Sequence, residues 1–160
     1  MNQPTGLTAD ILKRVLNIIA NNKSKIYGLD NPSFNESYIN IVQGETINDL
    51  SYNTTVDIST NVGTYNIYVS GGSNTSNYDI SYSIGTLTIT KAPLTVNAIN
   101  NNKIYGEIDP ALTNSYAGLR DWDTIDISSS RAVGEDVSGY VISNIVKVNN
   151  SLTLGNYALS

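Results

Sequence analysis

The sequence has no cysteine and no histidine among its 160 residues. Without cysteine the chain can form neither a disulfide nor a thiolate zinc site. Without histidine it cannot build the common catalytic triads, in which an imidazole moves the proton. Nothing in the remaining composition points to a nucleotide or redox cofactor. We therefore expect no enzymatic activity, no catalytic residues, no metal and no cofactor.

Charge and long apolar runs are also scarce. Charged residues make up 14% of the chain, and the net charge is −5 with scattered lysines and arginines, which argues against nucleic-acid binding. No apolar run reaches the roughly 18 residues that a membrane span needs, so no span is expected. Met1 is not followed by a basic segment and an apolar core, so a secretory signal peptide is not expected here. If the protein acts outside a cell, we expect its export signal elsewhere in a longer protein.

One sequence unit occurs twice. Leu16–Gly28 reads LNIIANNKSKIYG, and Leu94–Gly106 reads LTVNAINNNKIYG, at an offset of 78 residues (94 − 16). The offset persists downstream and then drifts to 75 and 79, as loop insertions and deletions would cause. Such a tandem unit indicates a repeat architecture. We predict repeat 1 over residues 16–92 and repeat 2 over residues 93–160. Residues 1–15 form a leader, or the closing strand of a preceding module.

Apolar and polar residues alternate with a period of two along most of the chain, which predicts antiparallel β strands with one solvated face. The phase of this alternation reverses at Gly85. Either a bulge or a hairpin would reverse it, and we favour a hairpin because the segments on both sides are long enough to pair. Residues 8–20 have helical spacing, but the alignment of Leu16–Ala20 with Leu94–Ala98 favours a strand there.

The predicted fold is all-β, with two tandem small β-sandwich modules of an immunoglobulin-like kind. The alternative is a β-grasp-like module with one short helix near Glu45–Leu50. Tyr65 and Tyr140 are either ordinary core tyrosines or the tyrosine corner of an immunoglobulin-like sandwich, in which the hydroxyl bonds the backbone. The short junction Lys91–Leu94 contains Pro93, so the modules should meet end to end as a semi-rigid rod.

Several short motifs recur in a fixed order and together resemble one known family. They are Lys25-Ile26-Tyr27-Gly28 with Lys103-Ile104-Tyr105-Gly106, Asp109-Pro110, Val62-Gly63-Thr64-Tyr65 and Ile89-Thr90-Lys91-Ala92. This set resembles the MBG-type repeats (YGX and YDG varieties) of bacterial cell-surface proteins and adhesins. The resemblance covers most of residues 16–160. It implies a structural or adhesive role without catalytic residues, in a larger exported protein at the extracellular bacterial surface.

The sequence departs from that family in two places. The glycine-rich turn of the family is replaced by Val42–Glu45 in repeat 1 and by Arg120–Asp123 in repeat 2. Repeat 2 also stops before its own copy of the strand Gly85–Lys91. We expect a sheet edge left open in this way either to be tolerated or to accept residues 7–13 of another chain, head to tail.

Three residues in the second of these turns are candidates for a ligand site. Trp122 is the single tryptophan and stands between Asp121 and Asp123. It could stack on a sugar ring while the carboxylates accept hydroxyl bonds, or it could cover the edge of a core. With Asp126 these aspartates could bind calcium, but no calcium-loop motif is present, and an exposed acidic turn is the better interpretation.

Two tyrosines precede glycine in the repeated motif, Tyr27 before Gly28 and Tyr105 before Gly106. Each could stack on a ligand or pack at the end of a strand, and recurrence in both repeats favours packing. Two functions remain open: a stalk or spacer that projects an adhesive region, and an adhesin module that binds a glycan or a host surface protein directly. The expected partners are neighbouring repeats of the same protein and, for the adhesin, that ligand.

Overall fold

The computed structural model describes residue 6, residues 9–147 and residues 154–160. The described residues form an all-β protein, as predicted. Their strands are β1 (Arg14–Ala20), β2 (Lys23–Ile26), β3 (Glu36–Ile39), β4 (Asn48–Asn53), β5 (Gly63–Ser73), β6 (Tyr78–Ser83), β7 (Gly85–Thr90), β8 (Ala92–Ala98), β9 (Asn114–Ala117), β10 (Asp126–Arg131), β11 (Ile142–Lys147) and β12 (Tyr157–Leu159). The described part of the chain has no helix with the length and apolar character that a bilayer crossing requires.

The chain divides into two compact units whose bounds differ from those of the sequence repeats in a few short segments. Unit 1 contains Met1–Ser24, Asn31–Val56 and Thr64–Thr88. Unit 2 contains Lys25–Asp30, Asp57–Gly63 and Ile89–Ser160. Two segments of the first sequence repeat therefore belong to unit 2, and the contacts that they make there are internal to that unit.

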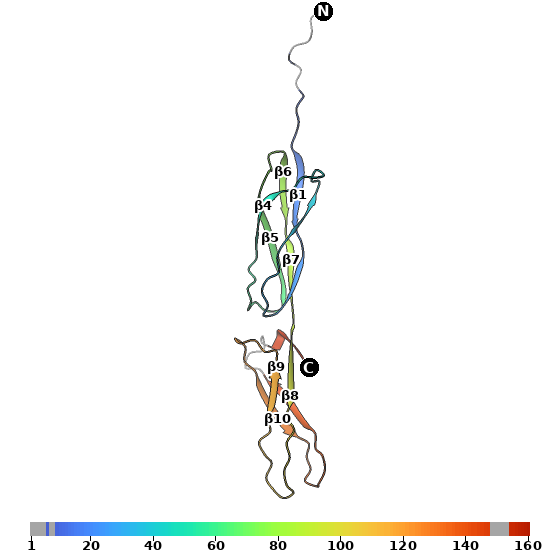
Figure 1. Cartoon of the computed structure of the whole chain (residues 1–160), viewed down its shortest axis with the longest axis vertical. Coiled ribbons are helices and arrows are strands. Elements are labelled where there is room, and N and C mark those ends of the chain that lie inside the picture. Colours follow the sequence, from blue (N-terminus) through green and yellow to red (C-terminus); the bar gives the residue numbers. More distant parts are fainter. Residues whose placement is uncertain (1–5, 7–8, 148–153) are drawn as a thin grey trace, which may run out of the picture. The chain divides into compact units, whose positions relative to one another are not determined.

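The strands of the first repeat form two sheets, with the orders β3-β1-β6 and β2-β7-β5-β4. Strand β1 pairs antiparallel with β3 and parallel with β6. Figure 1 shows β1 and β6 side by side. The expectation of purely antiparallel strands is therefore wrong at β1–β6, because alternation of side chains specifies a half-buried strand but not the direction of its partner.

The core of unit 1 follows from the period-two alternation. Leu16, Ile18 and Ala20 of β1 are buried, and so are Ile67 and Val69 of β5. Inward-facing side chains from both sheets are what a β-sandwich requires. The alternative with a helix near residues 45–50 is wrong, because residues 43–44 form a turn and strand β4 begins soon after it.

Residues 16–20 lie in strand β1, so the repeat alignment predicted this segment correctly and the helical spacing was misleading. The hairpin at Gly85 is wrong. Strand β6 pairs with β1, whereas the next strand, β7, belongs to the other sheet. The chain crosses between sheets at Gly85, where an added Cβ would lie 2.3 Å from the carbonyl oxygen of Ala20. Only glycine can approach another backbone so closely.

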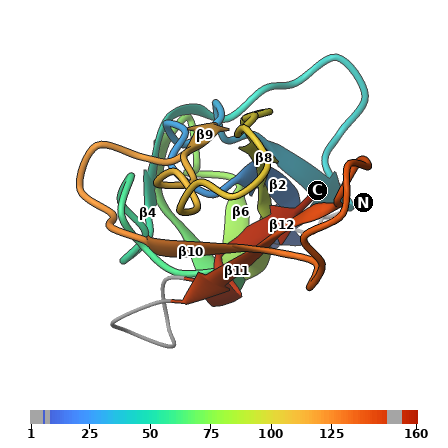
Figure 2. The ribbon, with the colours of Figure 1, turned by 90° about the horizontal axis from the view of Figure 1, so that it is seen from below.

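The second repeat places its strands in equivalent positions in unit 2. Strand β8 pairs antiparallel with β9 and parallel with β12, in the sheet order β12-β8-β9. The pair Ala98↔Asn114 matches Ala20↔Glu36 at the 78-residue offset. Strands β10 and β11 form a second, two-stranded sheet and lie side by side in Figure 2.

Candidate functional site

The repeated Lys-Ile-Tyr-Gly motif forms the same turn twice within unit 2. The Leu29 N–H donates to the Ile26 carbonyl at 3.1 Å, and the Glu107 N–H donates to the Ile104 carbonyl at 3.1 Å. The third residue of each turn is glycine, with φ of +78° at Gly28 and +86° at Gly106. A positive φ at this position is typical of a type II turn and favours glycine.

The lysine of the motif secures each turn. Lys25 Nζ donates to the Leu29 carbonyl at 3.0 Å, and Lys103 Nζ donates to the Glu107 carbonyl at 3.2 Å. Each ammonium also reaches a second segment. Lys25 bonds the carbonyl of Asp57 at 2.6 Å, and Lys103 bonds the carboxylate of Glu135 at 2.6 Å. The two tyrosines of the motif therefore occupy equivalent positions in one recurring local structure.

Their surroundings differ sharply. Tyr27 is 2% exposed, whereas Tyr105 is 70% exposed. Since the backbone of the two turns is alike, the difference comes from what covers the ring. The residues that cover Tyr27 come from the turn Arg120–Asp123 and from strand β12, and we call them the tyrosine clamp: Arg120, Trp122, Asp123 and Tyr157.

The clamp satisfies the Tyr27 hydroxyl as both donor and acceptor. The hydroxyl donates to Asp123 Oδ2 at 3.0 Å and accepts from Trp122 Nε1–H at 3.0 Å. The Tyr157 hydroxyl donates to the same Asp123 oxygen at 2.5 Å and accepts from the Arg120 backbone N–H at 3.0 Å. One carboxylate thus accepts from two tyrosines, and charge-assisted bonds of this kind are stronger than neutral ones.

Ring packing and an arginine complete the contact. The Tyr27 ring lies edge-on to Tyr157, with centroids 5.6 Å apart, and edge-on to Trp122 at 6.5 Å. Arg120 Nε and Nη2 donate to the Tyr27 carbonyl at 3.2 and 2.9 Å. A Cβ on Gly28 would meet Arg120 Nε at 2.2 Å. Gly28 therefore serves both the turn and the approach of the guanidinium.

Burial sets the protonation of the two clamped tyrosines. Desolvation is the main cause that raises the pKa of Tyr27, and the hydrogen bond to Asp123 adds to it, against an opposing bond from Trp122. Desolvation and then the hydrogen bond to Asp123 raise the pKa of Tyr157. Both phenols stay neutral donors well above physiological pH, which suits a fixed structural contact.

The same turn–tyrosine arrangement occurs inside unit 1. The Tyr78 hydroxyl donates to Glu45 Oε2 at 2.5 Å and accepts from the Val42 backbone N–H at 3.0 Å. The Glu45 N–H closes the turn by donating to the Val42 carbonyl at 3.0 Å. In repeat 2 the Asp123 N–H donates to the Arg120 carbonyl in the same way, at 2.9 Å. Val42 and Gly44 stand where repeat 2 has Arg120 and Trp122, so this copy lacks the two side chains that hold Tyr27.

A second contact in unit 2 joins strand β12 to the segment Asp57–Gly63. Asn156 is 3% exposed, and its side-chain oxygen accepts from the Val62 N–H at 2.9 Å. Its amide nitrogen donates to Asn61 Oδ1 at 2.7 Å. Asn156 and Tyr157 are neighbours in sequence. One dipeptide therefore binds the segment at Val62 through its asparagine and belongs to the tyrosine clamp through its tyrosine.

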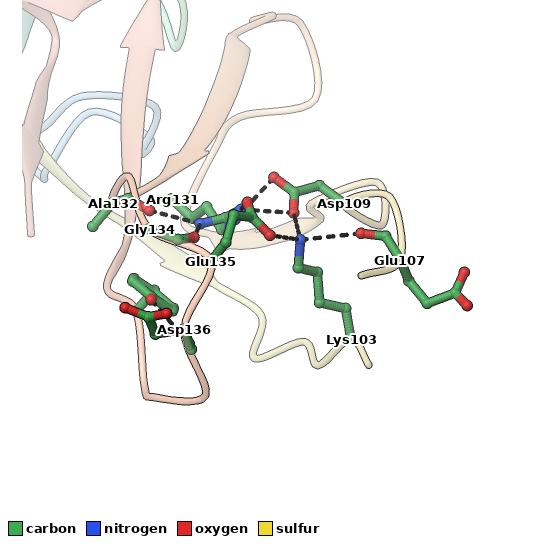
Figure 3. A network of polar contacts seen from close by, with 9 residues as sticks. Lys103, Glu107, Asp109, Arg131, Ala132, Gly134, Glu135 and Asp136 are labelled. Carbon is green, nitrogen blue, oxygen red and sulfur yellow. Dashed lines mark hydrogen bonds and ion pairs between the residues drawn. The ribbon is translucent and has the colours of Figure 1, made fainter. Parts of the chain in front are cut away.

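Four charged side chains form an ion-pair network beside Tyr105: Lys103, Asp109, Arg131 and Glu135. Figure 3 shows them meeting: Lys103 and Asp109 come from the loop between β8 and β9, Arg131 ends strand β10, and Glu135 lies in the loop after it. Arg131 binds Asp109 through two nitrogens, at 2.8 and 2.9 Å, and Glu135 at 2.5 Å. Lys103 binds Asp109 at 2.9 Å and Glu135 at 2.6 Å. The bonds from Arg131 and then Lys103 lower the pKa of Asp109 to about 2.

The network borders a groove of about 310 Å³. Its lining includes Tyr105, Val137 and Tyr140. The Tyr140 ring lies 5.3 Å from the Arg131 guanidinium carbon, within cation–π range. The Tyr140 hydroxyl donates to the Asp136 carbonyl at 3.0 Å, four residues upstream. This is the kind of bond that the tyrosine-corner hypothesis requires of Tyr140. The immunoglobulin-like arrangement itself, and the same role for Tyr65, stay predictions.

Comparison with known proteins identifies the type of repeat. The model of the family described as MBG domain (YGX type) matches residues 16–88 and residues 94–160. The chain belongs to this family. The resemblance drawn from the short motifs is thereby confirmed. No curated protein and no solved structure gives a significant match. Membership in the MBG family indicates a repeat of a surface protein.

The tyrosine clamp contains two of the three residues that the sequence analysis predicts as ligand-binding. Trp122 and Asp123 both bond Tyr27, whereas Asp121 is exposed. Trp122 remains 46% exposed, so part of its ring faces solvent. Among the described residues, no group of three or more acidic side chains is arranged to hold a metal ion. Binding of a ligand at these residues stays a prediction.

Sequence reasoning missed several residues of the MBG contact. Arg120 enters the sequence analysis only as part of the replaced turn. Tyr157, in the pair Asn156-Tyr157 that repeats Asn77-Tyr78, is not predicted as a site residue. The recurrence of that pair was the available signal, because an Asn-Tyr dipeptide kept in both repeats at a strand start indicates a fixed hydrogen-bonding role. No comparable signal marked Arg120, since repeat 1 has Val42 at that place.

Proposed function

We propose that this chain is a non-enzymatic structural segment of a bacterial surface protein, which acts as a stalk or spacer for an adhesive region. The observation that supports it is the tyrosine clamp. A residue from the first MBG repeat, Tyr27, is held among residues of the second by hydrogen bonds, ring packing and near-complete burial.

The chemistry of the clamp supports a structural role over a binding one. Asp123 and Trp122 would be the natural groups to recognise a sugar, but the Tyr27 hydroxyl occupies Asp123 Oδ2 and the indole N–H. A stalk also needs repeats that stay attached to one another along the chain, and several bonds to one buried ring attach a segment of the first repeat firmly to the second.

One observation favours the adhesin as the second candidate. About half of the Trp122 side chain faces solvent beside the exposed carboxylate of Asp121. An exposed aromatic ring next to a carboxylate is a reasonable sugar-binding pair. In this alternative the clamp positions Trp122 and the free part of its ring stacks on the glycan.

Spin labels test the stalk. Because the natural chain has no cysteine, Ser51→Cys and Ser128→Cys at two exposed strand positions can be labelled specifically. We expect a single narrow distance distribution in pulsed electron paramagnetic resonance. Tyr27→Ala should broaden it, and Tyr105→Ala, at the exposed copy of the same turn, should leave it unchanged. A broad distribution in the parent chain would contradict the stalk.

A glycan array with the full chain tests the adhesin. The stalk predicts no binding above background, for the parent chain and for Trp122→Ala alike. Reproducible binding of one glycan class that Trp122→Ala abolishes, with the narrow spin-label distribution kept by the parent, would establish the adhesin instead.

A further inference from the structure

We propose that the turn Ile104–Glu107, with the adjacent loop Glu135–Gly139, is a docking surface for a further MBG repeat. The partner we infer is a repeat that presents an Arg-x-Trp-Asp turn and an Asn-Tyr strand start, as residues 120–123 and 156–157 do here. The inference holds for a stalk and for an adhesin, because it concerns how MBG repeats bind one another.

The first ground is that the equivalent surface is already occupied once in unit 2. Tyr27 lies in the same kind of turn as Tyr105 and is covered by the tyrosine clamp. Val62, which aligns with Val137, gives its N–H to Asn156. No described residue covers Tyr105 or Val137 in this way, and they are 70% and 92% exposed.

The second ground is that the turn is formed before anything docks on it. The hydrogen bond from Glu107 to Ile104, the positive φ of Gly106 and the bond from Lys103 to the Glu107 carbonyl all match the occupied turn. A surface that needs no rearrangement loses little entropy on binding, which favours docking.

The third ground is the chemistry around Tyr105. Ile104 and Ile108 flank it and are 75% and 90% exposed, so large apolar side chains lie next to one another at the surface around this turn. The groove beside the ring continues this surface toward Pro110 and Leu112. The ion-pair network closes the other side by holding Glu135, and with it the loop to Gly139.

The occupied copy defines what the partner contributes. A carboxylate would accept from the Tyr105 hydroxyl, and an indole N–H would donate to it, as Asp123 and Trp122 do for Tyr27. A guanidinium would bind the Tyr105 carbonyl, and no Cβ at Gly106 obstructs its approach. An asparagine side chain would accept from the Val137 N–H, as Asn156 does from Val62.

An extended chain tests the proposal. Strand β12 corresponds to the first part of β6, because Tyr157 pairs with β8 as Tyr78 pairs with β1. Ser160 therefore corresponds to Ser81, and a second copy of residues 82–160 joined after Ser160 continues the repeat in register. In the added copy, Tyr105→Phe and Tyr116→Phe give these two peptides masses that differ from those of the original segment, so the two copies can be told apart. Nitration by tetranitromethane then reports the original tyrosines by mass spectrometry.

We expect Tyr105 of the original segment to react at least tenfold more slowly in the extended chain than in the 160-residue chain. Tyr116, exposed on strand β9, should react equally in both, and Tyr27 should be slow in both. Arg120→Ala with Trp122→Phe in the added copy should restore most of the reactivity of Tyr105.

Two outcomes would overturn the proposal. One is an unchanged Tyr105 rate in an extended chain whose added copy is folded, as shown by protection of its backbone amides from hydrogen exchange. The other is an added copy whose backbone amides stay unprotected from hydrogen exchange. That copy carries every residue with which repeat 2 covers Tyr27, so the proposal requires it to fold and dock.

Discussion

At the scale of single residues, the same side chain has different roles in identical turns. Tyr27 and Tyr105 share their preceding isoleucine, their following glycine and their lysine-bonded turn. What differs is the presence of an arginine, a tryptophan and an aspartate above the ring. The role of the motif therefore depends on the turn together with the residues that cover its tyrosine, and not on the motif alone.

Glycine substitutions separate these two contributions. Gly28→Ala should lower the stability of the chain by about 2–3 kcal/mol, because it combines a strained positive φ with displacement of Arg120. Gly106→Ala has the same strain but no atom within 4 Å of the new Cβ, so it should cost only about 1 kcal/mol. Urea unfolding followed by circular dichroism measures both, and equal losses would show that Arg120 moves aside freely.

The sequence predicts part of this site. Recurrence of Tyr27 and Tyr105 indicates packing at the end of a strand for both. Tyr27 does pack, whereas Tyr105 is 70% exposed. Recurrence could not reveal the partner of Tyr27, because Trp122 and Arg120 have no counterparts in repeat 1. A contact made by residues that occur in one copy only leaves no periodic signal, and residues 27 and 122 are too far apart in sequence for local rules to connect them.

At the scale of elements, alternation located the strands and left their pairing open. Leu16–Ala20, Tyr65–Val69 and Leu87–Ile89 are strands with the inward faces that alternation assigns. The sheet crossing at Gly85 was misread, because a change of sheet and a hairpin both reverse the phase. Strands β4 and β10 have burial patterns one residue out of phase, and Asp49 inside β4 has a φ of +57°. The pairing of β4 with β5 continues on both sides of Asp49, from Asn48↔Ser73 to Leu50↔Gly71, and sequence alternation does not predict such a local irregularity.

The ion-pair network makes the loops of repeat 2 sensitive to acid. The pKa of Asp109 is lowered to about 2, and that of Glu135 is lowered by Lys103 and Arg131. A carboxyl group with a lowered folded pKa stabilises the fold above its unfolded value and loses this contribution as the pH falls. The melting temperature of the parent chain should therefore exceed that of Asp109→Asn at pH 6, and the difference should vanish between pH 4 and pH 2.

The same difference should shrink in 1 M sodium chloride, because salt screens exposed ion pairs. Ser51→Ala, at an exposed serine of strand β4 outside the network, is the control and should keep a constant offset from the parent at every pH. A difference between parent and Asp109→Asn that persists at pH 2 would mean that packing, and not charge, explains the role of Asp109.

At the scale of the whole molecule, tyrosine takes the place that disulfides hold in many small extracellular domains. The chain has 11 tyrosines, one phenylalanine and no cysteine. Within the described residues, three carboxylates accept bonds from tyrosine hydroxyls: Glu36 from Tyr38 and Tyr52, Glu45 from Tyr78, and Asp123 from Tyr27 and Tyr157. Except for the bond from Tyr38 to Glu36 within β3, these bonds join segments that are distant in sequence, which explains the preference for tyrosine over phenylalanine.

This dependence predicts an alkaline limit to stability. The pKa of Tyr38 is raised to about 12 by desolvation and by Glu36, and the pKa values of Tyr27, Tyr52, Tyr78 and Tyr157 are also raised. A raised folded pKa contributes stability that is complete below the unfolded value near 10 and is lost as the pH rises above it. The urea midpoint should be constant from pH 7 to pH 9 and fall steadily above pH 10.

Tyrosinate absorbance at 295 nm gives the second measurement, since folded chains should ionise in two phases and urea-unfolded chains in one. Tyr38→Phe should remove part of the late phase. A urea midpoint that stays flat up to pH 11.5, or a single ionisation phase in the folded chain, would contradict the role given to these hydroxyls.

The parallel pairing of β1 with β6 has a mechanical consequence. Six consecutive residue pairs, from Arg14↔Tyr78 to Ile19↔Ser83, join these strands. In a parallel pair, tension applied before Arg14 and beyond Ser83 pulls the two strands in opposite directions along their length. All the hydrogen bonds between them are then loaded together in shear, whereas a hairpin pulled at its open end unzips one bond at a time. A repeat built in this way should unfold only at high force and at a low rate under a given load. This resistance depends on the unfolding rate and not on the equilibrium stability.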